Sequence, residues 1–217
     1  DILLSSSAIF TVLAIFFVGA FGSLFLARFL NDQGKWAGTL AHGAAFLGSF
    51  LALSIATKVL LSGQGIAFVV PGVFPGILDF SFRLDGLAAF FFGLIALIAL
   101  VSSLYGLSYQ KHFYGTYSLE NLGFFYNGLI ASLLLVTLAN QALFFLLVWE
   151  CMSLTSYFLV IYEYRKKENI RAGFLYFLMT HIGTLFITLA FFLAYQATGS
   201  FDFDAWRASA GTIDPML

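Results

Sequence analysis

The sequence contains little charge, and this scarcity decides its class. Only 10% of its 217 residues are charged, whereas an average soluble domain carries about 25%. Hydrophobic residues make up 61% of the chain, and 28 residues are Phe. So much apolar surface cannot face water, so we expect the lipid bilayer to be the solvent of this chain.

Side chains and motifs that mark other classes of protein are also scarce. The single cysteine, Cys151, excludes an internal disulfide and a cysteine-only metal site, and its apolar surroundings favour a packing residue over a reactive thiol. The net charge of −1, without a basic stripe, argues against nucleic acid as a partner. No Gly-rich phosphate loop, CxxC pair or Ser/His/Asp triad is present. We therefore predict no cofactor, no metal and no catalytic residue in this chain.

Long hydrophobic runs are what the sequence has instead. A helix needs about 20 apolar residues to cross the bilayer. Six runs are long enough, so we predict a single all-α integral membrane domain over residues 1–217 with about six transmembrane helices. The predicted spans lie near 3–30, 37–61, 85–109, 122–140, 141–163 and 172–196.

The connections between the spans predict orientation and one short β-element. Loops after the first, third and fifth spans carry seven basic residues and the other side carries three, so the first set is predicted to be cytoplasmic and both ends of the chain to lie outside. The outside loop 62–84 holds two Pro-Gly pairs beside strand-like runs, which leaves a β-hairpin and an irregular loop open. Between the fourth and fifth spans, LANQAL predicts a tight turn with Asn140 and Gln141 at one surface.

One carboxylate interrupts the fifth span. Glu150 lies about nine residues from the outer start of this span, so about 14 Å deep, where insertion costs about 2.5–3.5 kcal/mol. A carboxyl held away from water can take up and release a proton, which predicts a proton relay; a structural carboxyl bonded to neighbouring helices is the alternative. Ser153 and Tyr157 share its face, as relay groups or as ordinary packing residues.

The sixth span carries a polar stripe with a histidine beside it. Residues recurring every four positions form this stripe: Tyr176, Thr180, Thr184 and Thr188. Such a stripe indicates a helix face turned to protein or water rather than lipid. Because histidine changes charge near neutral pH, His181 is a second relay candidate, together with Thr184; a helix-contact histidine is the alternative. His42, near the inner end of the second span, is expected at the membrane interface.

Three segments resemble one family: FRLDGLAAFFFGLIALIALVSSLYGLSY, LANQALFFLLVWECMSLTSYFLVIY and AGFLYFLMTHIGTLFITLAFFLAYQATGSFDF. They are similar to the antiporter-like membrane subunits shared by respiratory complex I, Mrp cation/proton antiporters and group-4 membrane-bound nickel–iron hydrogenases. The pattern WE-x-MSL-x-SY, matched from Trp149 to Tyr157, is typical of their fifth helix. GFLYFLMTHIGTLF resembles the branch of hydrogenase-4 component B and the formate hydrogenlyase membrane subunit.

The resemblance implies a fold and a mechanism. Such subunits have about fourteen helices with inverted repeats, so this chain would be an N-terminal fragment of that fold. Glu150 would be the key proton-path carboxylate, paired with a lysine on a broken seventh helix expected beyond Leu217. Complex I relatives often have arginine where His181 stands. The implied partners are other membrane subunits, a peripheral redox arm and the lipid bilayer, and the implied location is the inner (plasma) membrane.

Three functions stay open at this point. The first is a proton- or cation-translocating subunit of a redox-driven complex, such as a membrane-bound hydrogenase, formate hydrogenlyase or NADH:quinone oxidoreductase, which itself binds no redox centre. The second is a structural scaffold that docks the redox arm. The third is a subunit of a Na⁺/H⁺ antiporter.

Overall fold

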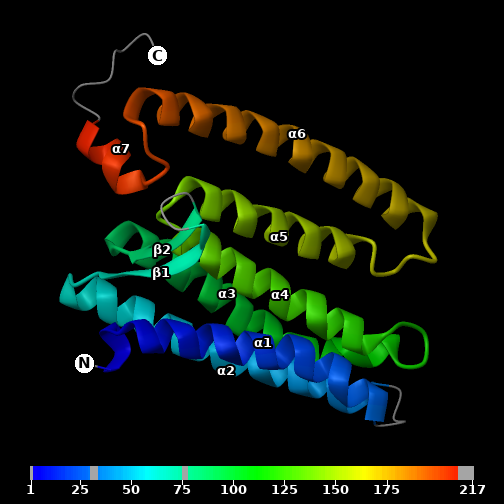
Figure 1. Cartoon of the computed structure of the whole chain (residues 1–217). Coiled ribbons are helices and arrows are strands. Elements are labelled where there is room, and N and C mark those ends of the chain that lie inside the picture. The colour runs from blue at the N-terminus through cyan, green and yellow to red at the C-terminus, as the bar shows by residue number, and fades with distance from the viewer. Residues whose placement is uncertain (1, 30–33, 75–77, 210–217) are drawn as a thin grey trace.

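The chain folds into a bundle of long helices with a small β-hairpin at one end (Figure 1). The computed structural model describes residues 2–29, 34–74 and 78–209. The long helices are α1 (Ser6–Phe29), α2 (Lys35–Ser62), α3 (Gly86–Tyr109), α4 (Leu119–Leu138), α5 (Ala142–Val160) and α6 (Lys167–Thr198). The short elements are η1 (Ile2–Leu4), β1 (Ile66–Phe74), β2 (Leu78–Leu84), η2 (Gln110–Phe113) and α7 (Phe203–Ser209). Six of the described helices are long and apolar enough to cross a membrane, which confirms the predicted all-α membrane fold.

Helices α1 to α4 form the packed core of the bundle. Their surfaces are apolar all round, so close approach of small residues, rather than the hydrophobic effect, holds such helices together in lipid. A Cβ added to Gly48 of α2 would lie 3.0 Å from the Phe16 ring of α1, which is fully buried. Gly106 of α3 leaves a similar notch for His42 of α2, which is 5% exposed. His42 is therefore buried between helices, a surrounding that its expected place near the membrane interface did not reveal.

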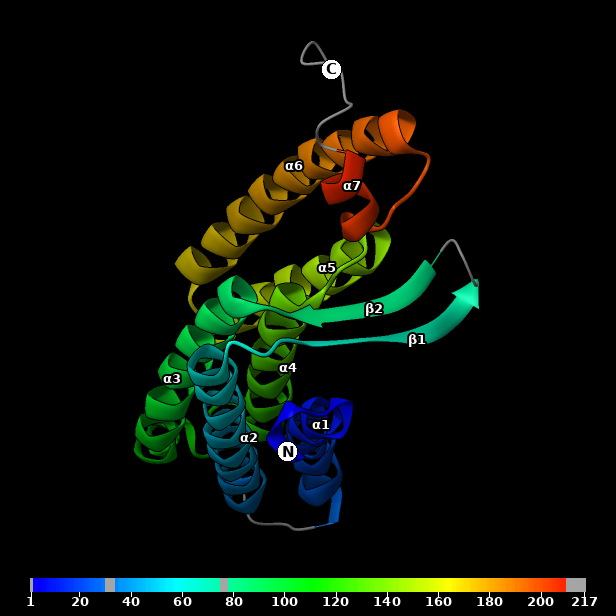
Figure 2. The same ribbon diagram turned by 90° about the vertical axis from the view of Figure 1, so that its left-hand side faces the viewer.

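The loop between α2 and α3 is an antiparallel hairpin that crosses one end of the bundle (Figure 2). Its register pairs Ile66 with Leu84 and Val70 with Phe80, and it becomes irregular between Val70 and Phe74. Pro71, which has no N–H to donate, lies within this irregular part. The second Pro-Gly pair, at 75–76, lies outside the described residues. The hairpin is attached through aromatic contacts: the Phe82 ring centroid lies 5.0 Å from that of Phe144 at the start of α5.

The turn between α4 and α5 is buried under this hairpin and α7. Asn140 and Gln141 are 4% and 6% exposed, so the predicted turn at the end of the two helices is covered by protein rather than open to water. The backbone N–H of Asn140 donates to the Ser81 carbonyl of β2 at 2.9 Å, and the Phe203 N–H of α7 donates to the Asn140 carbonyl at 3.1 Å. The Gln141 side chain accepts from the Phe144 N–H at 2.6 Å and so caps α5. Segments distant in sequence therefore cover both residues.

Helix α6 forms the flank of the bundle. In the most apolar part of each helix, 44% of the residues of α2 are buried, compared with 17% in α5 and 0% in α6. Figure 1 shows α6 beside α5, on the side of the bundle away from α1 and α2. Of the six long helices, α5 and α6 are therefore the least covered within the described structure, and they carry the candidate site.

Candidate functional site

Helix α5 carries Glu150 into the middle of the bundle. The helix begins at Ala142, directly after the Gln141 cap, and ends at Val160. Glu150 is therefore about 12 Å along the helix axis from Ala142. Its neighbours in sequence are Trp149 and Cys151, so the carboxylate lies inside an otherwise apolar stretch.

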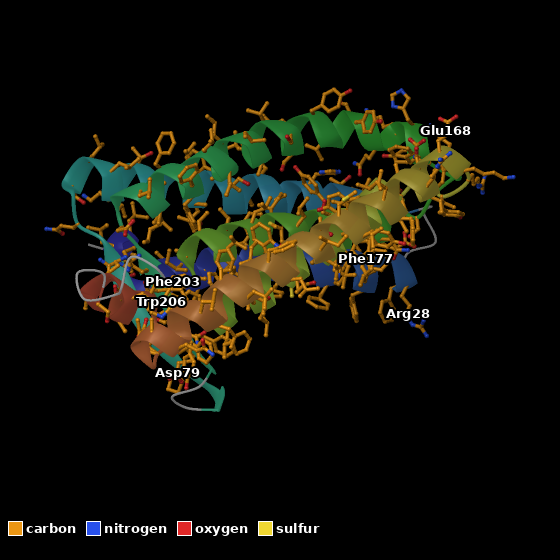
Figure 3. All side chains as sticks on the ribbon, turned by 90° about the horizontal axis from the view of Figure 1, so that it is seen from above. Arg28, Asp79, Glu168, Phe177, Phe203 and Trp206 are labelled. Atoms are coloured by element: carbon orange, nitrogen blue, oxygen red, sulfur yellow. The ribbon has the colours of Figure 1, made fainter. Side chains whose placement is uncertain are left out.

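Helix α6 brings His181 to the same depth. The Nε2 atom of His181 lies 3.3 Å from Oε2 of Glu150. The other ring nitrogen, Nδ1, lies 2.9 Å from the carbonyl oxygen of Phe177, one turn earlier in α6. The Phe177 ring packs against the imidazole with 4.0 Å between ring centroids. Figure 3 shows Phe177 on α6 between Glu168, at one end of the bundle, and Phe203 and Trp206, at the other.

The hydrogen-bond partners of the His181 ring show where its protons lie. A carbonyl oxygen only accepts, so Nδ1 of His181 must carry its hydrogen and donate to Phe177. Nε2 then faces Glu150 Oε2 at 3.3 Å, and the two groups form an ion pair when the ring carries a second proton. The arrangement therefore brings together two groups that can each take up or release a proton.

The pair is half open on one side. The side chains of Glu150 and His181 are 42% and 41% exposed, respectively, within the described structure. Glu150 is the only acidic residue among the 19 residues of α5. In hydrocarbon such an opening needs cover by protein or water, because lipid chains offer no hydrogen bonds to a charged group. This exposure places the pair at a surface where a further group can reach it.

The other predicted site residues make no hydrogen bond to the pair in the described structure. The Ser153 hydroxyl is 3% exposed and has no hydrogen-bond partner in the part of the chain that the structure describes. The Tyr157 ring packs against Phe177, with 5.4 Å between ring centroids. Thr184 accepts a hydrogen bond from Trp149 Nε1 at 3.2 Å and donates one to the Thr180 carbonyl at 3.0 Å. The structure thus brings Glu150 and His181 together, whereas Tyr157 and Thr184 contact neighbours of the pair and Ser153 is buried apart from it.

The threonine hydroxyls of the polar stripe on α6 donate hydrogen bonds to carbonyl oxygens of α6 itself. Thr180 donates to the Phe177 carbonyl at 3.0 Å, and Thr188 donates to the Thr184 carbonyl at 2.8 Å. Side chains of this kind commonly bond back to the preceding turn of a helix. The stripe therefore provides one contact between helices, the bond from Trp149 to Thr184, rather than a continuous row of free hydroxyls.

Two parts of the site were not predicted from the sequence. Trp149 was noted only as part of a motif, yet its indole N–H joins α5 to α6 next to Glu150. The Phe177 carbonyl, which orients His181, has no side-chain signature at all. A histidine four residues after any helical residue can make such a bond, so helical spacing alone could have suggested it. Among the described residues, no group of three or more His, Cys, Asp or Glu side chains is arranged to hold a metal ion.

Comparison with known proteins gives consistent results. Residues 139–213 match the protein family described as "NADH:quinone oxidoreductase/Mrp antiporter, TM". The chain is 40% identical over 129 residues to hydrogenase-4 component B of Escherichia coli, covering 59% of this chain and 19% of that protein. It is 32% identical over 127 residues to NADH-quinone oxidoreductase subunit L of Buchnera aphidicola, covering 58% of this chain and 20% of that protein. The chain thus spans about a fifth of the length of these relatives.

A solved structure shows the same fold. The chain is similar to a chain of the membrane-bound sulfane sulfur reductase (MBS), an archaeal respiratory membrane complex, with a TM-score of 0.75 and 17% identity. The alignment covers 97% of this chain and 42% of that one. At this identity the similarity establishes the arrangement of the helices. It extends over the N-terminal helices, which lie outside the matched family segment.

Proposed function

With the relation of this chain to the antiporter-like membrane subunits of complex I, Mrp and hydrogenase-type complexes as the premise, we propose that it is a proton-translocating part of such a subunit. The observation that carries the proposal is the contact between Glu150 and His181 in the middle of two membrane-spanning helices. Their shared proton is the transported species. The chain itself performs no bond chemistry and supplies no redox centre.

The pair works by gaining and losing one proton at a time. Adding a proton to the pair leaves a neutral Glu150 carboxyl beside a cationic His181. Removing the shared proton leaves a carboxylate beside a neutral imidazole. Each step changes the local charge by one unit in a medium of low dielectric constant, where a nearby charge acts strongly. A movement of a nearby charge can therefore drive uptake or release.

The open side of the pair supplies a place for that charge. The family resemblance implies a lysine on a further helix as the partner of Glu150. Such a cation, approaching the half-exposed carboxyl, would favour the ionised form and release the proton. Its withdrawal would restore the pair with His181. In this scheme His181 receives protons from a neighbouring group within the membrane. The protonation state of Glu150 then depends on how close the moving cation is.

The bundle ends support an orientation in the inner membrane. The connections α1–α2, α3–α4 and α5–α6 gather at one end of the bundle in Figure 1. The basic residues of this end are Arg28, Lys35, Lys111, Arg165, Lys166, Lys167 and Arg171. By the positive-inside rule this end faces the cytoplasm, and η1 and α7 lie on the outer side. The partners are further membrane subunits and a peripheral redox arm that supplies the energy.

The test is redox-driven proton uptake by membrane vesicles that contain the parent complex. Glu150→Gln keeps the size of the side chain but cannot be ionised, so we expect proton uptake to fall at least tenfold while the complex assembles. Glu168→Gln is the matched control, because Glu168 lies in the first turn of α6 at the bundle end (Figure 3). Normal uptake and turnover in Glu150→Gln would show that the carboxylate is structural and would favour the scaffold function.

The same vesicles separate proton from sodium transport. Uptake is measured with sodium ions present and with sodium replaced by potassium. A proton carrier keeps its rate in both media, whereas an antiporter that exchanges sodium for protons requires sodium. Loss of uptake on sodium removal would overturn the assignment of the proton as the only transported ion.

A further inference from the structure

A second polar site lies at the basic end of the bundle, away from Glu150 and His181. It is a cavity of about 400 Å³ between α2, α3, α4 and the segment that joins α5 to α6. Its polar lining residues include His42, Gln110, Tyr126, Tyr162, Glu163 and Asn169. Neither Glu150 nor His181 lines it, so the cavity is distinct from the site described above.

Two of these residues are locked in place by glycines on the opposite helix. The Gln110 side chain, at the end of α3, occupies the notch that Gly38 leaves in α2. The His42 ring of α2 occupies the notch that Gly106 leaves in α3. A Cβ at either glycine would collide with the polar side chain in the notch. The two helices therefore hold one polar group each against the other in a reciprocal arrangement.

Both groups are buried with hydrogen-bonding capacity unused. His42 is 5% exposed and Gln110 is 2% exposed. In the described ranges, His42 Nδ1 and Gln110 Oε1 have no hydrogen-bond partner in the protein. An unpaired buried polar atom costs about 1–3 kcal/mol, so natural folds usually pair such atoms with protein or with bound water. Both residues line a cavity large enough for several water molecules, each of which needs about 30 Å³.

We propose that this cavity is a water-filled inlet on the basic side of the bundle, with His42 and Gln110 as the residues that bind its water. The inlet admits water and small hydrated cations, the hydrated proton included, into the inner third of the membrane domain. Glu163 is the one carboxylate among its lining residues, and it forms an ion pair with Lys166.

The titratable groups around the inlet come from each element that packs there. The phenol of Tyr126 on α4 lies beside His42, with 5.1 Å between ring centroids, and its hydroxyl lies 3.1 Å from Ser103 Oγ. The Tyr162 hydroxyl donates to the Ser118 carbonyl at 3.0 Å. The remaining titratable lining residues are Tyr105, Tyr109 and Glu163. These hydroxyls extend the polar lining beyond the two unpaired atoms.

Thiol labelling tests the inlet directly. In a Cys151→Ser background, which removes the single cysteine of this chain, Ser102→Cys places a thiol on the cavity wall with almost no change in size. Val101→Cys is the matched control at the same depth of α3, because Val101 is 58% exposed and does not line the cavity. The probe is a positively charged, membrane-impermeant methanethiosulfonate, added to the basic side of vesicles that contain the parent complex.

We expect the cavity thiol to react at least tenfold faster than the control thiol, because this reagent needs water and an ionised thiol. Equal labelling rates at the two positions would contradict the proposal that the cavity is a water-filled inlet. Gln110→Leu, similar in size but unable to bind water, should slow labelling of Ser102→Cys at least threefold. An unchanged rate would show that Gln110 does not hold the water. Labelling does not depend on Glu150. The inlet can therefore be disproved while the proposed proton transport holds, and proton transport can be disproved while the inlet holds.

Discussion

Two carboxylates of this chain, Asp204 and Glu150, are held in opposite ways. Asp204, in α7, forms an ion pair with Arg83 and another with Arg207 at 2.7 Å. Its second oxygen accepts a hydrogen bond from the Asn140 amide at 2.9 Å. Glu150 has one ion-pair partner among the described residues, at 3.3 Å, and that partner is a histidine. Asp204 is surrounded by donors that stay charged or polar at every physiological pH, whereas Glu150 lies beside a partner that can itself lose a proton.

The difference decides which proton is exchangeable. Partial desolvation acts to raise the pKa of Asp204, but the hydrogen bonds from Asn140 and Arg207 and the charges of Arg83 and Arg207 outweigh it and lower this pKa below its ordinary value. Asp204 is therefore ionised throughout the physiological range and fixes the fold. A carboxyl whose partner can itself give up a proton has no such constraint. Under the proposed function, the same side-chain chemistry serves structure in α7 and proton exchange in the middle of α5.

The largest effect on stability is expected from breaking the hydrogen-bonded cluster around Asp204. Asn140→Ala removes a buried amide that bonds Asp204 and accepts from Arg207 at 3.2 Å. Hydrogen bonds to charged groups are worth about 1.5–3 kcal/mol each, so we expect a loss of about 2–3 kcal/mol of unfolding free energy. Thermal unfolding of the purified complex measures it. Asn121→Ala, at an exposed position near the start of α4, is the control and should change little; equal effects would contradict this account of the cluster.

The next effect concerns the exchangeable pair. His181→Gln keeps a polar side chain but cannot gain charge, so we expect proton uptake to fall about tenfold, which corresponds to about 1.4 kcal/mol, and its pH dependence to flatten. Uptake rates between pH 5.5 and 8.5 measure both. Thr188→Val, which removes only a hydroxyl bonded to its own helix, serves as the control. An unaltered pH profile in His181→Gln would show that the histidine only packs.

A smaller effect tests the joint between the two helices. Trp149→Phe removes the hydrogen bond to Thr184, worth about 1 kcal/mol, while keeping an aromatic ring beside Phe145. We expect proton uptake to fall by about two- to fivefold, because Glu150 and His181 then lie less accurately together. Thr184→Val removes the other partner and should give the same loss. If the two variants differ widely, the hydrogen bond is not the cause.

The smallest effect is a dependence on pH at the outer end. A carboxyl whose pKa is lowered on folding stabilises the fold above its unfolded pKa of about 3.9, and this contribution is lost as the pH falls through the folded value. We expect hydrogen-exchange protection of the α7 amides, corrected for intrinsic rates, to be lower at pH 3 than at pH 6. In Asp204→Asn this difference should shrink. If Asp204→Asn shows the same difference in protection between pH 3 and pH 6 as the wild type, other carboxyls cause the pH dependence.

The helices were predictable because length and apolar composition suffice for a membrane span. The contact between Glu150 and His181 was not, because the rotation of each helix about its axis depends on packing that helical spacing does not encode. Here the bond from Trp149 to Thr184 contributes to that rotation. The sequence thus identified the candidate residues of the site, but only the structure shows how they are arranged.

The surroundings of three polar residues near helix ends could not be predicted, for one physical reason. Such residues are expected near a membrane surface, where they usually face water or headgroups. Asn140 and Gln141 are instead covered by β2 and α7, which return from distant parts of the sequence. His42 is buried because a glycine on another helix leaves room for its ring. In each case a long-range contact overrides the local pattern.

The central claim is that Glu150 and His181 act as one unit, and a double-mutant cycle tests it most directly. Redox-driven proton uptake is measured for the wild type, Glu150→Gln, His181→Gln and the double variant in the same vesicles, with turnover as the internal reference. Residues that share one proton are strongly non-additive, so the double variant should be no slower than Glu150→Gln alone. A double variant slowed by the product of the two single effects would show that the residues act independently and would contradict the shared-proton account.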